Sequence, residues 1–266
     1  MHGIEKIAQR FALGRKNLVA YVMAGDPSLA ETLNILRALA HNGVGVIELG
    51  MPFSDPMADG PVIQAAALRA IAAGASLKAI LAMLAQFTAE FPAVPVILMG
   101  YINPVMQYGE QKFVKDAAAS GAAGLLLADM PPEEDSQMRG YCLAEKLAWI
   151  RLATPTSDVA RLPVVLKDAS GYIFYVSIAG ITGTAKAGVD AAINAVARIK
   201  AGTDLPVVVG FGVSEPEQAA AIARFADGVV VGSALVADLA HTHQAGGNIT
   251  QGVAEFVQPL VKAIGG

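Results

Sequence analysis

Cysteine, charged residues and long apolar runs are all scarce in this chain of 266 residues. The single cysteine, Cys142, excludes an internal disulfide and is typical of proteins that stay in a reducing compartment. Charged residues make up only 16% of the chain, the net charge is −4, and no cluster of Lys and Arg occurs. A nucleic-acid-binding protein would need a basic stripe, so we expect no nucleic-acid partner.

The chain also lacks a segment that predicts a membrane span, although its mean hydropathy is +0.49. Its longest stretch without a charged residue, 91–109, is interrupted by Pro92, Pro95, Asn103 and Gln107. A spanning helix needs about 20 predominantly apolar residues. The first residues show no basic segment followed by an apolar one, so we expect no signal peptide. The prediction is a cytoplasmic protein.

What the chain does contain is a regular alternation of apolar runs and helical patterns. The apolar runs, which we predict to be strands, cover 18–23, 44–49, 94–99, 124–128, 147–152, 172–177, 206–210 and 228–231. They are apolar on both faces, as in parallel sheets that helices cover. The helical patterns that follow them cover 28–41, 62–73, 77–90, 111–120, 133–145, 158–167, 189–200, 215–225 and the region from 234 onward. Eight such repeats without a break in composition predict one domain, residues 1–266, folded as a (β/α)8 TIM barrel with extra helices.

Three carboxylates lie in the second predicted strand and in the loop behind it, on what would be the functional face of a barrel. Glu48 stands inside the apolar strand, and Asp55 and Asp59 follow in a loop that ends at Gly60 and Pro61. Burial should raise the pKa of Glu48 and suit it to proton transfer near neutral pH. The alternative is a structural carboxylate paired with a buried Arg or Lys. Asp59 can equally be a turn and N-cap residue, and Asp55 is better understood as an organiser of the loop.

Glycine follows the last three predicted strands, and this pattern predicts a phosphate site. Gly183 lies in the loop behind strand six, and Gly212 and Gly232 with Ser233 come directly behind strands seven and eight. Glycine lets the backbone approach an anion closely, and free N–H groups at a helix start can hold a phosphate without a metal. Barrels commonly place such a site behind strands seven and eight. The alternative is that these glycines only form tight turns.

Several other chemistries are excluded by position. The four histidines lie at 2, 41, 241 and 243, none of them at a predicted strand end, so we expect neither a metal site nor a histidine-based triad. No lysine ends a strand, which disfavours a Schiff-base aldolase. Cys142 falls in a helical pattern, where a small core residue is expected.

With these residues assembled, the chain resembles the α subunit of tryptophan synthase over essentially its whole length. The most specific match is 48–64 (ELGMPFSDPMADGPVIQ), supported by 180–183 (GITG), 210–214 (GFGVS) and 232–233 (GS). The resemblance implies retro-aldol cleavage of indole-3-glycerol phosphate to indole and glyceraldehyde 3-phosphate. It implies that Glu48 transfers the protons and that Asp59 hydrogen-bonds the indole N–H as positive charge develops.

The resemblance also implies the remaining site residues. The glycine cradle would hold the substrate phosphate, and Thr182 would contact Asp59 when the loop behind strand six closes. The expected walls of the indole pocket are Tyr21, Ile63, Leu126, Tyr172, Phe174 and Phe211. Two positions depart from the family: Phe174 stands where members often carry Tyr, and Ile178 follows Ser177 where enterobacterial-type members carry Arg.

A partner protein is implied as well. The family resemblance predicts an α2β2 heterotetramer with a β subunit that carries pyridoxal phosphate and receives the indole, whereas this chain itself needs no cofactor. Loops 53–57, 103–107 and 129–134 would face that partner. Two alternatives stay open: another phosphate-binding barrel isomerase, and a catalytically weak barrel that acts mainly as an activator of the β subunit.

Overall fold

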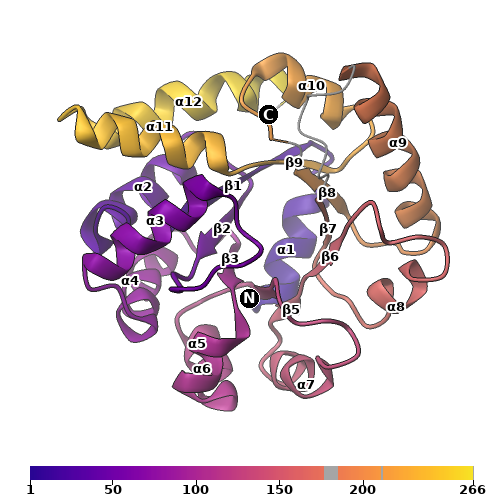
Figure 1. Ribbon diagram of the computed structural model, residues 1–266, viewed down its shortest axis with the longest axis horizontal. Coiled ribbons are helices and arrows are strands. Elements are labelled where there is room, and N and C mark those ends of the chain that lie inside the picture. Colours follow the sequence, from indigo (N-terminus) through magenta and orange to yellow (C-terminus); the bar gives the residue numbers. More distant parts are fainter. Residues whose placement is uncertain (177–184, 211, 266) are drawn as a thin grey trace.

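In the computed structural model the chain is described over residues 1–176, 185–210 and 212–265. This part of the chain forms nine parallel strands in the order β5-β4-β3-β2-β1-β9-β8-β7-β6. The strands are β1 Asn17–Met23, β2 Val46–Gly50, β3 Val96–Gly100, β4 Gly124–Leu127, β5 Ala148–Trp149, β6 Arg151–Ala153, β7 Ile173–Val176, β8 Val207–Gly210 and β9 Gly228–Val231. β5 and β6 are two pieces of one extended segment, interrupted at Ile150. Because β5 pairs with β4 and β6 pairs with β7, the sheet returns on itself as a barrel (Figure 1).

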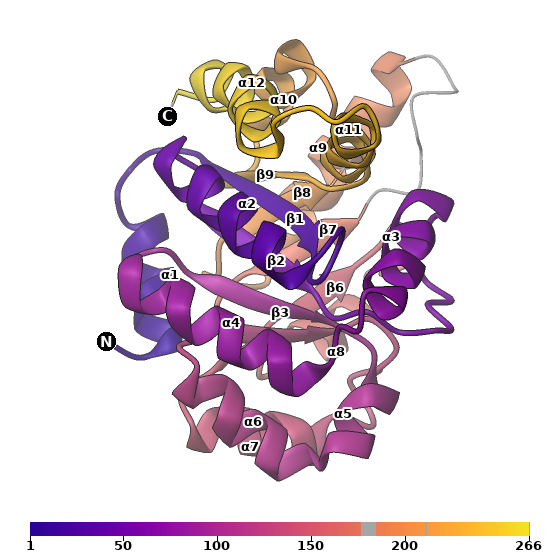
Figure 2. The same cartoon turned by 90° about the vertical axis from the view of Figure 1, so that its left-hand side faces the viewer.

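Helices surround this barrel and connect its strands (Figures 1 and 2). They are α1 Gly3–Phe11, α2 Leu29–His41, α3 Pro61–Ala72, α4 Leu77–Glu90, α5 Ile102–Tyr108, α6 Glu110–Ala119, α7 Ser136–Ala144, α8 Leu162–Leu166, α9 Ala185–Ala201, α10 Pro216–Ala223, α11 Ser233–Gln244 and α12 Ile249–Ala263. The predicted (β/α)8 barrel with extra helices is therefore confirmed, with the fifth predicted strand split in two.

Several helices differ from the prediction: α7 begins at Ser136 rather than at 133, and the region from 234 onward forms two helices, α11 and α12. α5 was not predicted, because a segment with Asn103 and Pro104 suggests a loop; yet proline is compatible with a first helical turn. The Asp129 carboxylate accepts a hydrogen bond from the N–H of Ile102 at 2.9 Å and so satisfies one free donor at the start of α5. α8 covers only Leu162–Leu166 of the predicted 158–167, and α9 begins at Ala185 rather than at 189.

The apolar residues form an inner and an outer layer. The inner layer fills the barrel and includes Val19, Val46, Leu126 and Val208, whose neighbours along each strand point outward to the helices. α1 covers the N-terminal end of the barrel, where Ile7 is fully buried in this inner layer. With that end covered, the space left for a site lies at the C-terminal ends of the strands.

Two expectations about single features can be compared with the fold. Cys142 is fully buried on α7 in the outer apolar layer, as predicted for a small core residue. Within the described residues no single helix is long and apolar enough to cross a membrane; only α3 and α4 taken together reach that length and composition, and they are bent by 98°.

Candidate active site

A cavity of about 600 Å³ opens at the C-terminal ends of the strands. Glu48 and Asp59 line one side of it, and Gly212, Gly232 and Ser233 line another. Every strand of the barrel except β5, or the loop directly behind it, contributes to the wall of this cavity. Two of the three predicted carboxylates and the described part of the predicted phosphate cradle thus share one cavity.

Glu48 is held at the bottom of this cavity by β2, a strand that is buried along its whole length. The carboxyl group is completely buried, and its Oε1 accepts a hydrogen bond from the Tyr172 hydroxyl at 2.6 Å. Its Oε2 is buried with no hydrogen-bond partner within the described ranges. Burial raises the pKa of Glu48 to about 7, and the hydrogen bond from Tyr172 opposes part of that rise. This group therefore changes protonation close to neutral pH.

The structural alternative for Glu48 required a basic partner, and among the described residues Glu48 forms no ion pair. The buried arginine of the barrel wall, Arg151, pairs with Asp135 instead. A buried carboxyl with a phenol as its neighbour and one free oxygen is typical of a proton-transfer group rather than of a structural ion pair.

The raised pKa of Glu48 predicts how the stability of the fold depends on pH. The unfolded chain ionises this group near pH 4.5, whereas the folded protein does so near 7. The folded state therefore holds one more proton between these values, and its stability falls as the pH rises through that window, by about 3 kcal/mol for this one group.

The measurement compares the free energy of unfolding of the wild type and of Glu48→Gln, in urea, at pH 5 and at pH 8. We expect the variant to gain stability relative to the wild type at pH 8, because its amide has no charge to bury. A difference that stays constant between the two pH values would show that Glu48 ionises at an ordinary pKa.

Asp59 lies in the loop between β2 and α3, half-buried at the mouth of the cavity. It is not the N-cap of α3, because Gly60 occupies that position and Pro61 the first helical turn, so the N-cap alternative is wrong. Tyr101, directly behind β3, holds this loop: its hydroxyl accepts a hydrogen bond from the N–H of Ala58 at 3.0 Å. Burial raises the pKa of Asp59, and a hydrogen bond with Tyr101 opposes that rise.

The third carboxylate plays a different part. Asp55 is exposed, does not line the cavity, and accepts a hydrogen bond from the Ser54 hydroxyl at 2.5 Å. This contact within the loop agrees with its interpretation as an organiser of the loop.

Another part of the cavity wall carries backbone donors. Gly232 is the N-cap of α11, and Ser233 and Ala234 form the first turn of that helix, whose free N–H groups meet the cavity. Gly212 has a φ of 65°, a conformation that favours glycine. A helix start of this kind suits a phosphate group. Gly183 and Thr182 lie outside the described residues, as do Ser177 and Ile178.

The predicted apolar walls are placed in part. Tyr21, Ile63 and Phe174 line the cavity, whereas Phe211 lies outside the described residues. Leu126 and Tyr172 do not line the cavity, because they lie one alternation deeper, in the inner apolar layer. The described wall is completed by residues that were not predicted: Met99, Ala128, Leu152, Thr154, Val176, Val213 and Val230.

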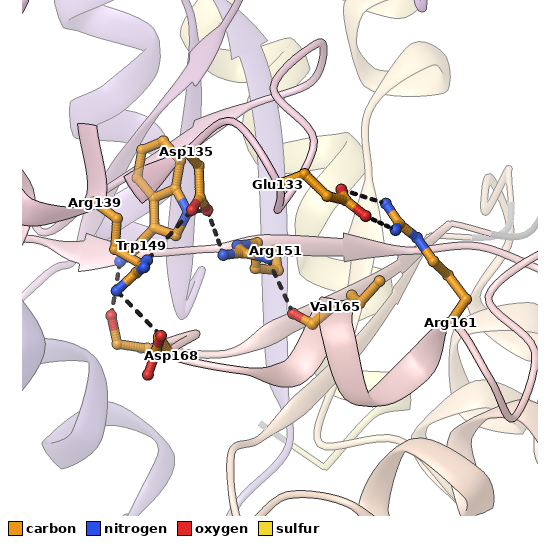
Figure 3. A network of polar contacts seen from close by, with 9 residues as sticks. Glu133, Asp135, Arg139, Trp149, Arg151, Arg161, Val165 and Asp168 are labelled. Carbon is orange, nitrogen blue, oxygen red and sulfur yellow. Dashed lines mark hydrogen bonds and ion pairs between the residues drawn. The ribbon is translucent and has the colours of Figure 1, made fainter. Parts of the chain in front are cut away.

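A buried polar network supports the wall beside β6 (Figure 3). The carboxylate of Asp135 is completely buried, accepts a hydrogen bond from Trp149 Nε1 at 2.6 Å, and forms ion pairs with Arg151 and Arg139. Arg139 also pairs with Asp168 at 3.2 Å. The network ties the N-terminus of α7 to β5 and β6, directly before the cavity residues at 152 and 154. It was not predicted; the signal in the sequence was a single arginine inside an apolar strand.

The comparisons with known proteins agree with this geometry. The family model described as "Tryptophan synthase alpha chain" matches residues 7–264. The chain belongs to the tryptophan synthase alpha chain family. Among solved structures, the tryptophan synthase alpha subunit of Legionella pneumophila is 37% identical, with a TM-score of 0.91 over 99% of this chain and 98% of that one. A tryptophan synthase structure from M. tuberculosis is 32% identical, with a TM-score of 0.86 over 97% of this chain and 98% of that one.

The match to the tryptophan synthase alpha chain family covers the whole barrel, because it leaves out only a few residues at each end. Within the described part of this family member, no group of three or more His, Cys, Asp or Glu side chains is placed to hold a metal ion. The polar groups that meet in the cavity are carboxylates, hydroxyls and backbone N–H groups.

Proposed function

We propose that this chain cleaves indole-3-glycerol phosphate to indole and glyceraldehyde 3-phosphate. The observation that carries the proposal is Glu48, a carboxyl with a pKa of about 7 and one free oxygen, in the same cavity as the N-terminus of α11. One part of the cavity wall suits a phosphate and another a proton transfer, and apolar residues such as Ile63, Phe174 and Val230 also line it.

The reaction divides into steps that these residues can perform. Glu48 in its protonated form gives its proton to C3 of the indole, which makes the ring a cation and a good leaving group. The carboxylate then takes the proton of the glycerol hydroxyl next to the ring. The bond between that carbon and C3 breaks, its electron pair returns to the indole, and the hydroxyl oxygen becomes the aldehyde oxygen. Glu48 ends as it began, so the cleavage consumes no further reactant.

Asp59 stabilises the positive charge that these reaction steps create on the indole ring. A carboxylate at the mouth of the cavity can accept a hydrogen bond from the indole N–H, and the bond strengthens as the ring becomes cationic. Tyr101 holds the backbone beside Asp59 and so positions it. Binding of the phosphate at the start of α11 would hold the substrate skeleton against Glu48, far from the bond that breaks.

A β subunit is the proposed acceptor of the indole, in an α2β2 assembly in which the pyridoxal phosphate belongs to that partner and this chain needs no cofactor of its own. Support comes from family membership and from exposed apolar side chains in the segments named for this contact: Met57, in the loop behind β2, is 81% exposed, and Met106, which lies on α5 rather than in a loop, is 57% exposed. Both lie near the functional face, where a partner would cover them. The single buried cysteine suits a reducing cytoplasm for this assembly.

The test is indole release from indole-3-glycerol phosphate by the purified chain, alone and with the β subunit of a family member. We expect release by the chain alone and a faster rate with the partner, because docking would order the loops around Asp59. Isomerase turnover without indole would favour the other phosphate-binding barrel enzymes. No release alone, together with stimulation of the β reaction, would favour a barrel that only activates its partner.

A further inference from the structure

Beside the two carboxylates, the cavity also contains the hydroxyl of Tyr21. Tyr21 lies on β1 directly opposite Glu48 of β2 in the parallel register. Residues paired in this way point to the same face of a sheet. Val19, two residues earlier on β1, lies in the inner layer of the barrel, so Tyr21 stands one alternation higher, at the level of the cavity.

Two glycines fix where the phenol lies. A Cβ built on Gly50 would come within 2.2 Å of Tyr21 Oη, so the hydroxyl lies directly over the backbone at the end of β2. A Cβ built on Gly232 would meet the Cβ of Tyr21 at 3.4 Å. The ring therefore runs from the phosphate side of the cavity to the strand end that leads into the Asp59 loop. Any larger residue at position 50 would displace the hydroxyl.

The surroundings of this hydroxyl show which role it can take. Burial, together with the nearby carboxylates Asp59 and Glu48, raises the pKa of Tyr21 well above its ordinary value. The phenol therefore stays protonated at any pH at which Glu48 titrates, and it can donate a hydrogen bond but cannot act as a base. Among the residues that the structure describes, the Tyr21 hydroxyl forms no hydrogen bond, although the side chain is only 7% exposed. A donor of this kind needs an oxygen from the cavity to bond.

We propose that the Tyr21 hydroxyl binds the glycerol oxygen that Glu48 deprotonates. The inference rests on the proposed cleavage of indole-3-glycerol phosphate, and it gives Tyr21 a polar role in place of the purely apolar one expected from the sequence. The oxygen that loses its proton must lie against Glu48, and Tyr21 is the paired residue on the adjacent strand. As the proton leaves, negative charge gathers on that oxygen, and a hydrogen bond to a charged acceptor is stronger than one to a neutral acceptor. The hydroxyl thus stabilises the transition state of the bond cleavage more strongly than it stabilises the bound substrate.

The test compares Tyr21→Phe with the wild type and with Tyr175→Phe. Tyr175 is a matched control, because it is a tyrosine that is 3% exposed, on β7, and packs in the outer layer away from the cavity. For Tyr21→Phe we expect kcat for indole release to fall by about tenfold or more, with a smaller change in KM and an unchanged midpoint of the pH profile. For Tyr175→Phe we expect kcat close to that of the wild type.

A second measurement separates the hydroxyl from the shape of the ring. Indole-3-propyl phosphate is a substrate analogue without the glycerol hydroxyls, so it offers Tyr21 no oxygen to bond. The analogue should therefore inhibit Tyr21→Phe as tightly as it inhibits the wild type. A wild-type kcat in Tyr21→Phe overturns the inference, and so does an equal loss of kcat in Tyr175→Phe. Weaker binding of the analogue to Tyr21→Phe also overturns it, because Tyr21 would then act only as a wall of the pocket. If the wild type itself releases no indole, the proposed function fails first and the inference falls with it.

Discussion

Replacing Glu48 by Gln is expected to lower the rate of indole release by about a thousandfold, while the barrel stays folded. Acid–base groups typically contribute between about a hundredfold and ten-thousandfold to a rate, and Glu48 serves two proton transfers in the proposed cycle. Gln has nearly the same volume and can still accept the hydrogen bond from Tyr172, so the packing under the cavity is kept. What it lacks is a proton that leaves near pH 7.

The measurement is steady-state indole release at saturating substrate, with circular dichroism to check the fold. Asp59→Asn is the comparison variant: it keeps a hydrogen-bond acceptor for the indole N–H and loses only the charge, so we expect a smaller fall than in Glu48→Gln. Tyr172→Phe removes the donor to Oε1 and should shift the pH profile to higher pH, because that hydrogen bond lowers the pKa of Glu48. Near wild-type rates in Glu48→Gln would remove the proton-transfer role altogether.

The strands were predictable because each is buried on both faces, which leaves an apolar run that no other element explains. Which side chains share a face was predictable from the alternation of side chains along a strand. The depth of each side chain in the barrel was not, since depth depends on strand tilt and stagger. Leu126 and Tyr172 were therefore expected in the pocket wall, where Ala128 and Phe174, two residues further on, actually lie.

The carboxylates of the site were predictable as candidates, but their division of roles depends on contacts that are distant in sequence. Glu48 and Tyr172 are 124 positions apart. Tyr101 reaches the loop before Asp59 from a different strand, 43 positions from the Ala58 N–H that it binds. α5 was missed for the same reason, because the carboxylate that satisfies its first turn, Asp129, belongs to the next loop. Local patterns carry no information on such pairs.

Replacing Asp135 by Asn is expected to destabilise the fold by about 3–5 kcal/mol. Arg151 is only 5% exposed, and the Asp135 carboxylate balances its charge inside the wall between β6 and α7 (Figure 3). Asn keeps the shape and an acceptor for Trp149, but it leaves the guanidinium buried without its counter-charge, which costs far more than the loss of an exposed pair. Folding stability in urea, followed by the fluorescence of this single tryptophan, measures the change.

Figure 3 also contains the control for this prediction. Glu133 and Arg161 form an ion pair with side chains that are 50% and 39% exposed, and Glu133→Gln should cost less than about 1 kcal/mol. The double variant Asp135→Asn with Arg151→Met removes both buried charges, so it should recover much of the stability that Asp135→Asn alone loses. Equal losses in Asp135→Asn and Glu133→Gln would mean that solvent reaches Arg151. In that case the wall of the cavity at Leu152 and Thr154 would owe its position to apolar packing alone, because the network behind it would add no stability.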